Sequence, residues 1–495
     1  MKKSFTAFEY HKDANFYPAN YCYEGSAESG WIIYRNNKHY LTLPSGYLLL
    51  KTLCCGICST DIARHKLPFP LPQITGHEVV ASYDGTKVVV DINAAHKHLG
   101  DKSQCYYCEN DLQNHCPDRL TLGIDRLPGG FAPYILVPAN AIYPLPENFS
   151  VKLASIIEPF AAALHAVKSE NIQAGDTIAI IGPRRLGSLL ILALNLWREK
   201  YKINVKISAL TRNDNVQHLC ELAGADEVVH IDNLGTSTYD VVFDTSGSTS
   251  GFELALSIAN RVVHVKSTNG QQACGLKYLT EMVIDELSLL PMKKVSVSQK
   301  LSPYFPKELE KIIMKKTGAT AVVDRNVDKL TIGRLEKYFP NLKILDQKEL
   351  EDGKEYLVRK FDIAIGSSLE FINSVTRNKM SQAAIKPKGL LVLITDDKTQ
   401  IVPGHATHEP VNESVSHAMG RGVKINTSRC GDFLSAIDFF GAASFTKNNK
   451  LENKGKRIES FLDYFVSATY NDDSFLDAFE RAKNDREAVK VLVEF

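Results

Sequence analysis

The feature that most constrains the fold of this chain is a short apolar strand followed at once by a glycine turn and an apolar helix. Residues 177–181, Thr-Ile-Ala-Ile-Ile, precede a turn at 182–187 and a helical stretch from Leu189 to Trp197. Strand patterns recur at 205–210 and 239–244, again alternating with helical ones. This alternation predicts a parallel sheet with helices on both faces. We therefore expect an α/β fold with a doubly wound parallel sheet.

The glycine turn is a candidate phosphate-binding loop. Its sequence, Gly182-Pro-Arg-Arg-Leu-Gly187, has the first and third glycines of a dinucleotide fingerprint. Arg184 replaces the middle glycine, which normally lets the pyrophosphate approach the backbone. The Arg184 guanidinium either obstructs that approach or grips phosphate. Thr211-Arg212 ends the next strand, where a carboxylate would bind the ribose diol, so an arginine there favours NADP over NAD unless it is only a solvated surface residue.

A cysteine, a histidine and a glutamate far apart in the sequence form a candidate metal set. Cys58, His77 and Glu158 offer a thiolate, an imidazole and a carboxylate, the kind of set that catalytic zinc uses with its fourth position open. Each residue alone has an ordinary interpretation: an inert buried thiol, a structural histidine and a carboxylate at a helix start. The spacing Cys55-Gly-Ile-Cys58 also suits a redox dithiol, but no thioredoxin-like helix start is visible. Their joint occurrence favours zinc.

Together these motifs resemble the medium-chain, zinc-dependent alcohol dehydrogenase family. A glutamate as third ligand is more similar to its polyol and threonine dehydrogenase branches, and the resemblance covers about 45–290 and 425–495. It implies a GroES-like β-barrel catalytic domain, a Rossmann domain, and hydride transfer between an alcohol or polyol and NAD(P). Two alternative hypotheses remain: the chain is a zinc-free reductase of the same superfamily, or it is a catalytically degenerate binding or scaffolding protein.

The resemblance also assigns roles around the candidate zinc. Thr60 matches the position whose hydroxyl passes the substrate proton on, although a simple cap at the end of a strand is the ordinary alternative. Asp61 and Glu78 look like carboxylates that steady His77 and moderate the charge of the metal, and Glu78 is a possible alternate ligand.

A second cysteine cluster resembles the structural zinc lobe of the family. Cys105, Cys108 and Cys116 match the last three of its four cysteines, and the first is replaced by a loop that carries His96 and His98. Three cysteines and one histidine, with His96 as the tentative fourth ligand, make a reasonable zinc site. A lobe without metal, or a site completed by water, is the alternative.

Composition excludes several other classes of protein. The formal net charge of +1 gives no electrostatic reason to expect nucleic acid or an anionic membrane as partner. No apolar run approaches the ~18 residues of a membrane span, and no signal-peptide pattern follows the first residues. Six of the ten cysteines lie between positions 54 and 116, which indicates metal binding rather than disulfides. We expect a cytoplasmic enzyme with a small-molecule substrate.

Residues 291–424 interrupt the resemblance and read as an inserted α/β segment. A helix is predicted from Leu309 to Met314 and strands at 361–366 and 389–394. Their order echoes the preceding part of the chain, so the insertion is either a degenerate half-Rossmann repeat or an unrelated α/β segment. The expected domains are a catalytic domain (1–165, completed by 432–495), a Rossmann domain (166–290, completed by about 425–431) and the insertion (291–424).

The insertion also bears on assembly. The chain leaves the Rossmann sheet near Leu290 and returns near Lys424, at the edge through which two subunits of this family commonly pair. Because exposed sheet edges bind other strands unless they are covered, we expect the insertion to pack against this edge. The sequence then predicts a monomer or an altered homodimer.

Overall fold

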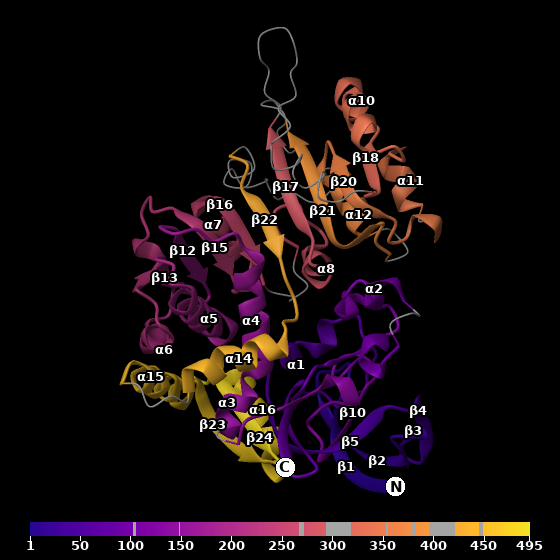
Figure 1. Ribbon diagram of the computed structural model, residues 1–495, viewed down its shortest axis with the longest axis vertical. Coiled ribbons are helices and arrows are strands. Elements are labelled where there is room, and N and C mark those ends of the chain that lie inside the picture. Colours follow the sequence, from indigo (N-terminus) through magenta and orange to yellow (C-terminus); the bar gives the residue numbers. More distant parts are fainter. Residues whose placement is uncertain are drawn as a thin grey trace.

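The computed structural model describes residues 1–101, 105–147, 149–266, 272–293, 318–352, 355–377, 382–395, 421–444 and 449–495. A β-rich part holds both termini, and a long α/β sheet lies above it (Figure 1). This arrangement confirms the predicted fold class. Within the described residues, no helix combines the length and the apolar character needed to cross a membrane.

The β-rich part consists of two main sheets. The first is an antiparallel meander of β1 (Lys2–Tyr10), β2 (Phe16–Ser26), β3 (Gly30–Arg35) and β4 (Lys38–Leu43). The second has seven strands, and its last two come from the C-terminus, so the two ends of the chain build one domain. Its strands are β11 (Ile142–Pro144), β7 (Thr86–Val90), β6 (Glu78–Tyr83), β5 (Tyr47–Gly56), β24 (Lys490–Glu494) and β23 (Val466–Asn471), with β10 (Tyr134–Pro138) paired to β5.

The first six strands of the α/β sheet are parallel and have the predicted doubly wound order. They are β14 (Glu227–His230), β13 (Lys206–Thr211), β12 (Thr177–Ile181), β15 (Tyr239–Asp244), β16 (Ala259–Val265) and β22 (Lys424–Thr427). Alternate residues of β12 enter opposite cores: Ile178 and Ile180 pack on the side of α5 (Arg185–Tyr201), whereas Ala179 and Ile181 pack on the side of α7 (Thr249–Ile258). Burial on both faces explains why this strand is apolar throughout.

The described part of the insertion continues this sheet, as Figure 1 shows in its orange strands. β17 (Ser288–Lys293) pairs antiparallel with β22 at Leu289 and Ile425, and parallel with β21 (Ile385–Thr395). β20 (Phe361–Gly366), β18 (Ala321–Asp324) and β19 (Lys343–Leu345) complete one eleven-stranded sheet. The predicted strands of the insertion are therefore present, while the predicted helix from Leu309 to Met314 lies outside the described residues.

The two halves of the sheet exchange strands and share a core. Along the chain β16 is followed by β17, and β21 by β22, although β22 lies beside β16 and β17 beside β21. One apolar cluster contains both Val263 of the first half and Leu391 of the second. The insertion is thus part of the sheet and not a separate lobe, and it covers the edge formed by β22. The oligomeric state stays a prediction.

The remaining elements are short strands and helices that connect or cover these sheets: β8 (Asn93–Ala94), β9 (Leu120–Thr121), α1 (Ser59–Ile62), α2 (Tyr106–Glu109), α3 (Val151–Ser155), α4 (Ile157–Ser169), α6 (Gln217–Ala223), α8 (Leu279–Ile284), α10 (Lys329–Tyr338), α11 (Gln347–Glu351), α12 (Leu369–Thr376), α14 (Phe433–Ser444), α15 (Asn449–Phe465) and α16 (Phe475–Asn484).

Candidate active site

Asp61 joins the two segments that carry the candidate zinc ligands. Cys58 lies between the end of β5 and the start of α1, and its backbone N–H donates to Asp61 Oδ2 at 2.8 Å. The backbone N–H of Gly76 donates to Asp61 Oδ1 at 3.0 Å, and the same oxygen lies 3.3 Å from His77 Nδ1. One buried carboxylate therefore fixes Cys58 beside His77 and occupies the far side of the imidazole, which leaves Nε2 for a ligand.

Cys58, His77 and Glu78 bring ligand atoms together within 4.8 Å of one another. Glu78 is also held by Lys490, whose ammonium donates to Glu78 Oε2 and, at 3.3 Å, to the carbonyl of Ile57. Burial alone would lower the pKa of His77, but Asp61 and Cys58 raise it well above its usual value. A thiol, an imidazole and carboxylates that favour positive charge fit a zinc ion.

Glu158, the predicted third ligand, is not in this set of three but acts on it. It lies in the first turn of α4. Burial raises the pKa of Glu158 to about 7; the charge of His77 opposes this shift and that of Glu78 adds to it. The Glu158 carboxylate therefore interacts electrostatically with His77 and Glu78. Glu78, which the sequence predicts only as an alternate ligand, lies closer to Cys58 and His77. Thr60 is half-buried in α1, two residues after Cys58.

The cysteine lobe forms a second, closed cluster. The ligand atoms of His96, Cys105, Cys108 and Cys116 lie within 4.8 Å of one another. The sulfurs of Cys105 and Cys116 are 3.8 Å apart, and Cys116 Sγ is 3.5 Å from His96 Nδ1. Ligands at ~2.3 Å from a tetrahedral zinc are separated by ~3.8 Å, so this spacing fits the metal. His98 points elsewhere: its Nδ1 accepts from the Ala95 backbone.

The glycine turn keeps its backbone geometry. Gly182 has φ +77°, a conformation that favours glycine. A Cβ on Gly187 would lie 2.4 Å from the carbonyl oxygen of Gly182, so the third glycine is needed for the close approach of α5 to the turn.

Two arginines at the start of α5 donate hydrogen bonds to the C-terminal part of the catalytic domain. The Arg184 guanidinium donates to the carbonyls of Asp485 and Ala488 at 2.9 and 2.7 Å. Arg185 donates to the carbonyls of Ala482 and Val489 and to Ser59 Oγ. The side chain that replaces the middle glycine is therefore turned from the sheet toward the neighbouring domain.

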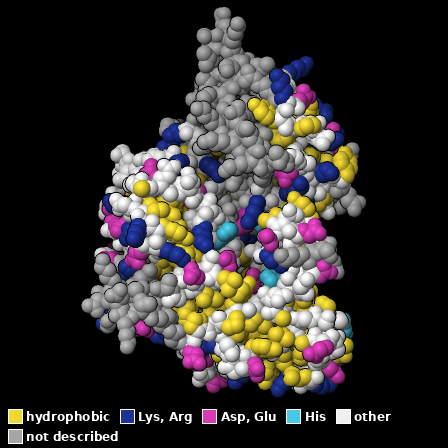
Figure 2. All heavy atoms as spheres, viewed as in Figure 1, with side chains coloured by type: hydrophobic (Ala, Val, Ile, Leu, Met, Phe, Trp, Pro, Cys, Tyr) yellow, Lys and Arg dark blue, Asp and Glu magenta, His cyan; other side chains and the backbone are white. Residues whose placement is uncertain are grey.

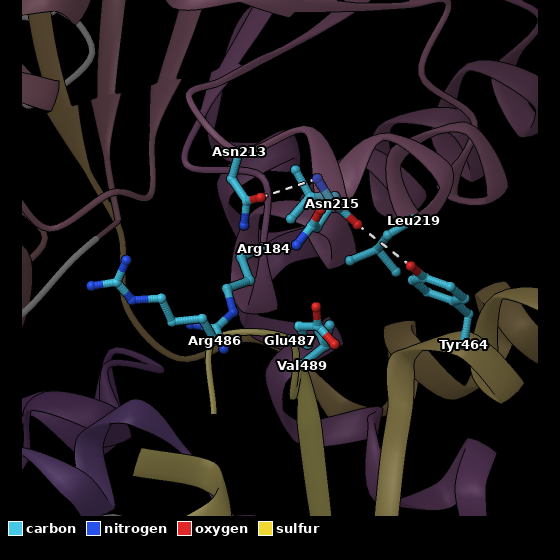
Figure 3. A pocket seen from close by; sticks show the side chains of 9 residues that line it. Arg184, Asn213, Asn215, Leu219, Tyr464, Arg486, Glu487 and Val489 are labelled. Carbon is cyan, nitrogen blue, oxygen red and sulfur yellow. Dashed lines mark hydrogen bonds between the residues drawn. The ribbon is translucent and has the colours of Figure 1, made fainter. Parts of the chain in front are cut away.

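A cavity of about 260 Å³ lies beside Arg184 (Figure 3). Two guanidiniums and two carboxamides line it, a set that fits the phosphates and polar groups of a nucleotide. It opens near the carboxyl ends of β12 and β13, where ligands bind in doubly wound sheets. Arg212 is exposed and does not line this cavity, and Thr211 hydrogen-bonds Asn213. The lining residues are Arg184, Asn213, Asn215, Val216, Leu219, Tyr464, Arg486, Glu487 and Val489.

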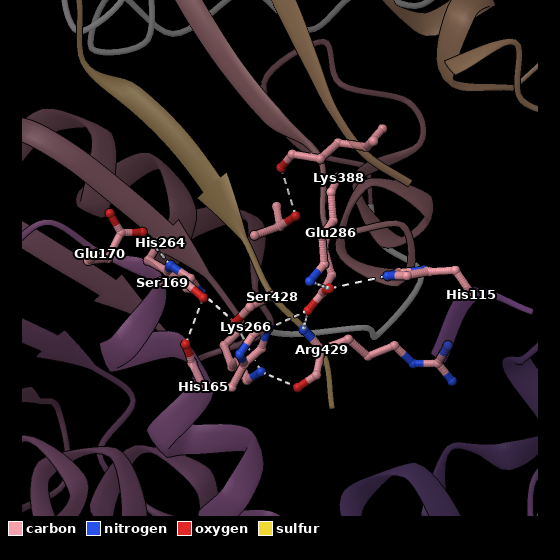
Figure 4. Close-up of polar contacts among 12 residues, drawn as sticks. His115, His165, Ser169, Glu170, His264, Lys266, Glu286, Lys388, Ser428 and Arg429 are labelled. Carbon is pink, nitrogen blue, oxygen red and sulfur yellow. Dashed lines mark hydrogen bonds and ion pairs between the residues drawn. The ribbon is translucent and has the colours of Figure 1, made fainter. Parts of the chain in front are cut away.

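A buried polar network follows the carboxyl ends of β16 and β22 (Figure 4). Lys266 donates to Ser428 Oγ at 3.1 Å and to the carbonyl of Arg429. Burial lowers the pKa of Lys266 to about 8. Glu286 contacts His115 and His165 at 3.2 and 2.8 Å and accepts from the Arg429 backbone at 2.9 Å.

The sequence did not assign roles to Lys266, Arg429 or Lys490. A usable signal existed for the first two, because basic residues at the ends of neighbouring parallel strands meet at one edge.

Comparisons with known proteins agree with this geometry. Residues 44–147 match the family described as the alcohol dehydrogenase GroES-like domain. A D-arabitol-phosphate dehydrogenase from Enterococcus avium is 28% identical over 238 residues, which are 43% of this chain and 65% of the relative. An L-threonine 3-dehydrogenase from Pectobacterium atrosepticum is 27% identical over 238 residues, covering 43% and 63%. A short chain alcohol dehydrogenase from E. coli CFT073, complexed with cofactor NADH, has a TM-score of 0.51 at 14% identity over 99% of both chains.

These findings show that the chain is similar to zinc-type alcohol dehydrogenases over its GroES-like domain and over 43% of its length. The matched region spans just under two thirds of the length of these curated relatives. The structural likeness supports the fold: a GroES-like domain joined to a parallel α/β sheet.

Proposed function

We propose that the chain is a zinc-dependent, NAD(P)-linked dehydrogenase that acts on an alcohol or polyol. The observation that carries this proposal is the convergence of Cys58, His77 and Glu78 within 4.8 Å, with Glu158 in the same field. The match to the alcohol dehydrogenase GroES-like domain and the relatives named D-arabitol-phosphate and L-threonine 3-dehydrogenases support the reaction class.

In this proposal Cys58, His77 and a carboxylate hold the zinc. The sequence predicts Glu158 as that carboxylate with Glu78 as the alternate, and the geometry favours Glu78, whose ligand atom lies within 4.8 Å of those of Cys58 and His77. Zinc would supply Lewis-acid polarisation of the substrate oxygen, and NAD(P) would supply the hydride acceptor. The alcohol loses a hydride from its carbon and a proton from its oxygen, leaving a carbonyl.

The residues of the chain orient these groups and move the proton. Asp61 Oδ1 lies 3.3 Å from His77 Nδ1, which would leave Nε2 as the ring nitrogen that binds the metal. Thr60 is placed two residues after Cys58 to accept the substrate proton. Lys490 fixes Glu78 and offsets its negative charge. Arg184, Arg486, Asn213 and Asn215 would hold the phosphate-bearing end of the cofactor; the preference for NADP rests on Arg212.

One observation favours the alternative of a catalytically degenerate binding or scaffolding protein. Arg184 and Arg185 tie the dinucleotide turn to the catalytic domain where phosphate would approach. Zinc binding without any affinity for NADH or NADPH would support that alternative.

The test is turnover with both cofactors. The purified protein is assayed for oxidation of NADH and NADPH with aldehydes and ketoses, and for their formation with alcohols and polyols, with His77→Ala as the inactive variant. We expect wild-type turnover with at least one pair and a loss of at least ~100-fold in His77→Ala, because the zinc is released. His39→Ala, at an exposed histidine of β4, is the matched control. Equal rates in wild type and His77→Ala would overturn the proposal.

A further inference from the structure

Glu286 is a buried carboxylate that connects four parts of the fold (Figure 4). Its Oε1 lies 2.8 Å from His165 Nε2 of α4 and accepts from the Arg429 backbone N–H at 2.9 Å. Its Oε2 lies 3.2 Å from His115 Nε2 of the cysteine lobe and 3.6 Å from the Lys388 ammonium of β21. An ionised carboxylate only accepts hydrogen bonds, so both imidazoles present an N–H to it. Glu286 therefore fixes the lobe, α4, the turn after β22 and the insertion relative to one another.

Backbone strain is concentrated at the contact between Glu286 and the insertion. Glu286, Arg359 and Lys388 have φ angles of +54°, +50° and +57°, in the left-handed region that favours glycine. Asp285 joins the two basic residues, because its carboxylate accepts from Arg359 and its carbonyl accepts from the Lys388 N–H at 2.8 Å. Strained residues persist only where surrounding contacts hold them, and they cluster at functional sites. The insertion thus holds Asp285 and Glu286 in a conformation that their own backbone disfavours.

The contacts of Glu286 reach the candidate active site along α4. Glu158, Ala161 and His165 lie at positions i, i+3 and i+7 of this helix, so they share one face. Gly431 packs on the helix at Ala161, since a Cβ added to Gly431 would lie 1.8 Å from the Ala161 carbonyl oxygen. The turn that carries Gly431 therefore crosses α4 between Glu158 and His165.

Arg429 is held on both sides of its place in this turn. Its N–H donates to Glu286, and its carbonyl accepts from Lys266, which directly follows β16. The carboxyl ends of parallel strands such as β16 and β22 form the edge where ligands of doubly wound sheets bind. Figure 2 shows acidic, basic and histidine side chains gathered in the middle of the visible face, where the upper sheet meets the lower barrel. Glu286 thus fixes a turn at the edge of the sheet that faces the catalytic domain.

We propose that Glu286 is a positioning residue of the active site, through which the insertion holds α4 and the turn at 428–431 in place around the Cys58–His77 cluster. The inference rests on the proposed function. Glu286 acts through His165 and Arg429 and not by contact with the substrate. Because a misplacement of ~1 Å costs up to ~100-fold in rate, loss of this carboxylate should lower kcat more than it weakens binding.

The experiment compares Glu286→Gln with a change at a second buried carboxylate. Glutamine has nearly the same shape, but its amide nitrogen donates, so it would face one of the surrounding N–H groups with another. Asp324→Asn is the matched control, because Asp324 of β18 is buried and accepts from Asn326 and Ser367. We expect both variants to lose thermal stability. Only Glu286→Gln should lose kcat on the best substrate of the turnover screen, by at least ~10-fold, with KM and the Kd of NADH and NADPH within ~3-fold of wild type.

Zinc release gives a second readout that does not depend on turnover. Transfer of zinc from each protein to a chromogenic chelator is followed over time, and the phase that His77→Ala lacks is assigned to the Cys58–His77 cluster. This phase should be at least ~10-fold faster in Glu286→Gln and unchanged in Asp324→Asn, because residues that orient a metal site tune its affinity. Glu286→Asp keeps the charge but shortens the side chain, so it should show the same change, and it replaces the glutamine variant if that variant does not fold.

The outcomes separate this inference from the proposed function. Faster zinc release in Glu286→Gln, in a protein that turns over no substrate, would overturn the dehydrogenase and support Glu286 as a positioning residue of the metal cluster. If Glu286→Gln matches Asp324→Asn in both kcat and zinc release, Glu286 is only structural and the inference is wrong. Faster release from the cysteine lobe alone, with kcat unchanged, would show that Glu286 supports the lobe through His115 and would also overturn the inference.

Discussion

At the scale of single residues, the candidate site depends on buried groups that position others. Asp61 binds the backbone of Cys58 and of Gly76 and lies against His77, so one carboxylate sets the separation of two ligands. Lys490 holds the carboxylate of Glu78 in place through a hydrogen bond, although the two residues are 412 positions apart in the sequence. His264 is a third such group: its Nδ1 lies 2.5 Å from Glu170 Oε1, and its Nε2 lies 2.8 Å from Ser428 Oγ. Removing any of them should disturb geometry more than chemistry.

His264 predicts a pH-dependent contribution to stability. Burial lowers the pKa of His264 below its usual 6.5, and Glu170 only partly offsets this. As pH falls through 6.5, the unfolded chain takes up a proton that the folded chain does not, so the contribution of His264 is lost. We expect His264→Gln, which cannot titrate, to lose less thermal stability than wild type between pH 7.5 and pH 5. Parallel curves for the two proteins over that range would contradict the assignment.

Residue chemistry also decided what the sequence could predict. Cys58, His77 and the three lobe cysteines could be predicted as candidate metal ligands, because few other roles suit thiols and imidazoles that occur together. Glu78 is part of the Cys58–His77 cluster, but its closeness depends on the bend between Gly76 and β6, which no local pattern encodes. Lysines and arginines such as Lys490 and Arg429 are common on any surface, so only the fold distinguishes the buried ones.

At the scale of elements, the start of α5 is where the chain departs most from a usual dinucleotide turn. The strand, the turn and the helix were predictable from apolar runs and two glycines, and all are present. The contacts of Arg184 were not predictable, because its partners at Asp485 and Ala488 lie some 300 positions away in another domain. Arg184 also lines the cavity with Arg486. We therefore expect its guanidinium to leave the two backbone carbonyls when the cofactor binds and to donate to a cofactor phosphate instead, because bonds to a charged acceptor are stronger.

Arg184→Met should therefore weaken NADPH binding by roughly tenfold, as measured by fluorescence titration, because one charge-assisted contact is lost. Arg198→Met is not a suitable control, because Arg198 donates to the carbonyl of Gly224 at the end of α6. Arg481 of α16 is exposed and is the better control. Arg481→Met should leave the affinity unchanged. If Arg184→Gly, which restores the usual glycine, binds NADPH more tightly than wild type, the side chain obstructs the cofactor and this expectation is wrong.

At the scale of the whole molecule, the insertion turns a six-stranded sheet into one of eleven strands. The sequence located the insertion and two of its strands, but not the exchange by which β17 and β22 each join the other half. That exchange depends on pairing between strands that are distant in the sequence. The apolar pattern of a strand does not indicate which other strand it pairs with. The cluster that contains Val263 and Leu391 makes the two halves one folded unit. The edge that β22 would otherwise expose is covered from within the chain.

We propose that this chain holds a catalytic zinc at Cys58 and His77 and a structural zinc in the cysteine lobe. The most direct test is the zinc content of the purified protein by mass spectrometry of the metal, for wild type, Cys58→Ser and Cys108→Ser. We predict two zinc ions per chain in wild type and one in each variant. Cys108→Ser should also lower the melting temperature, because a closed structural site contributes folding energy. Two zinc ions retained in Cys58→Ser, or none in wild type, would show that these residues do not hold zinc as proposed.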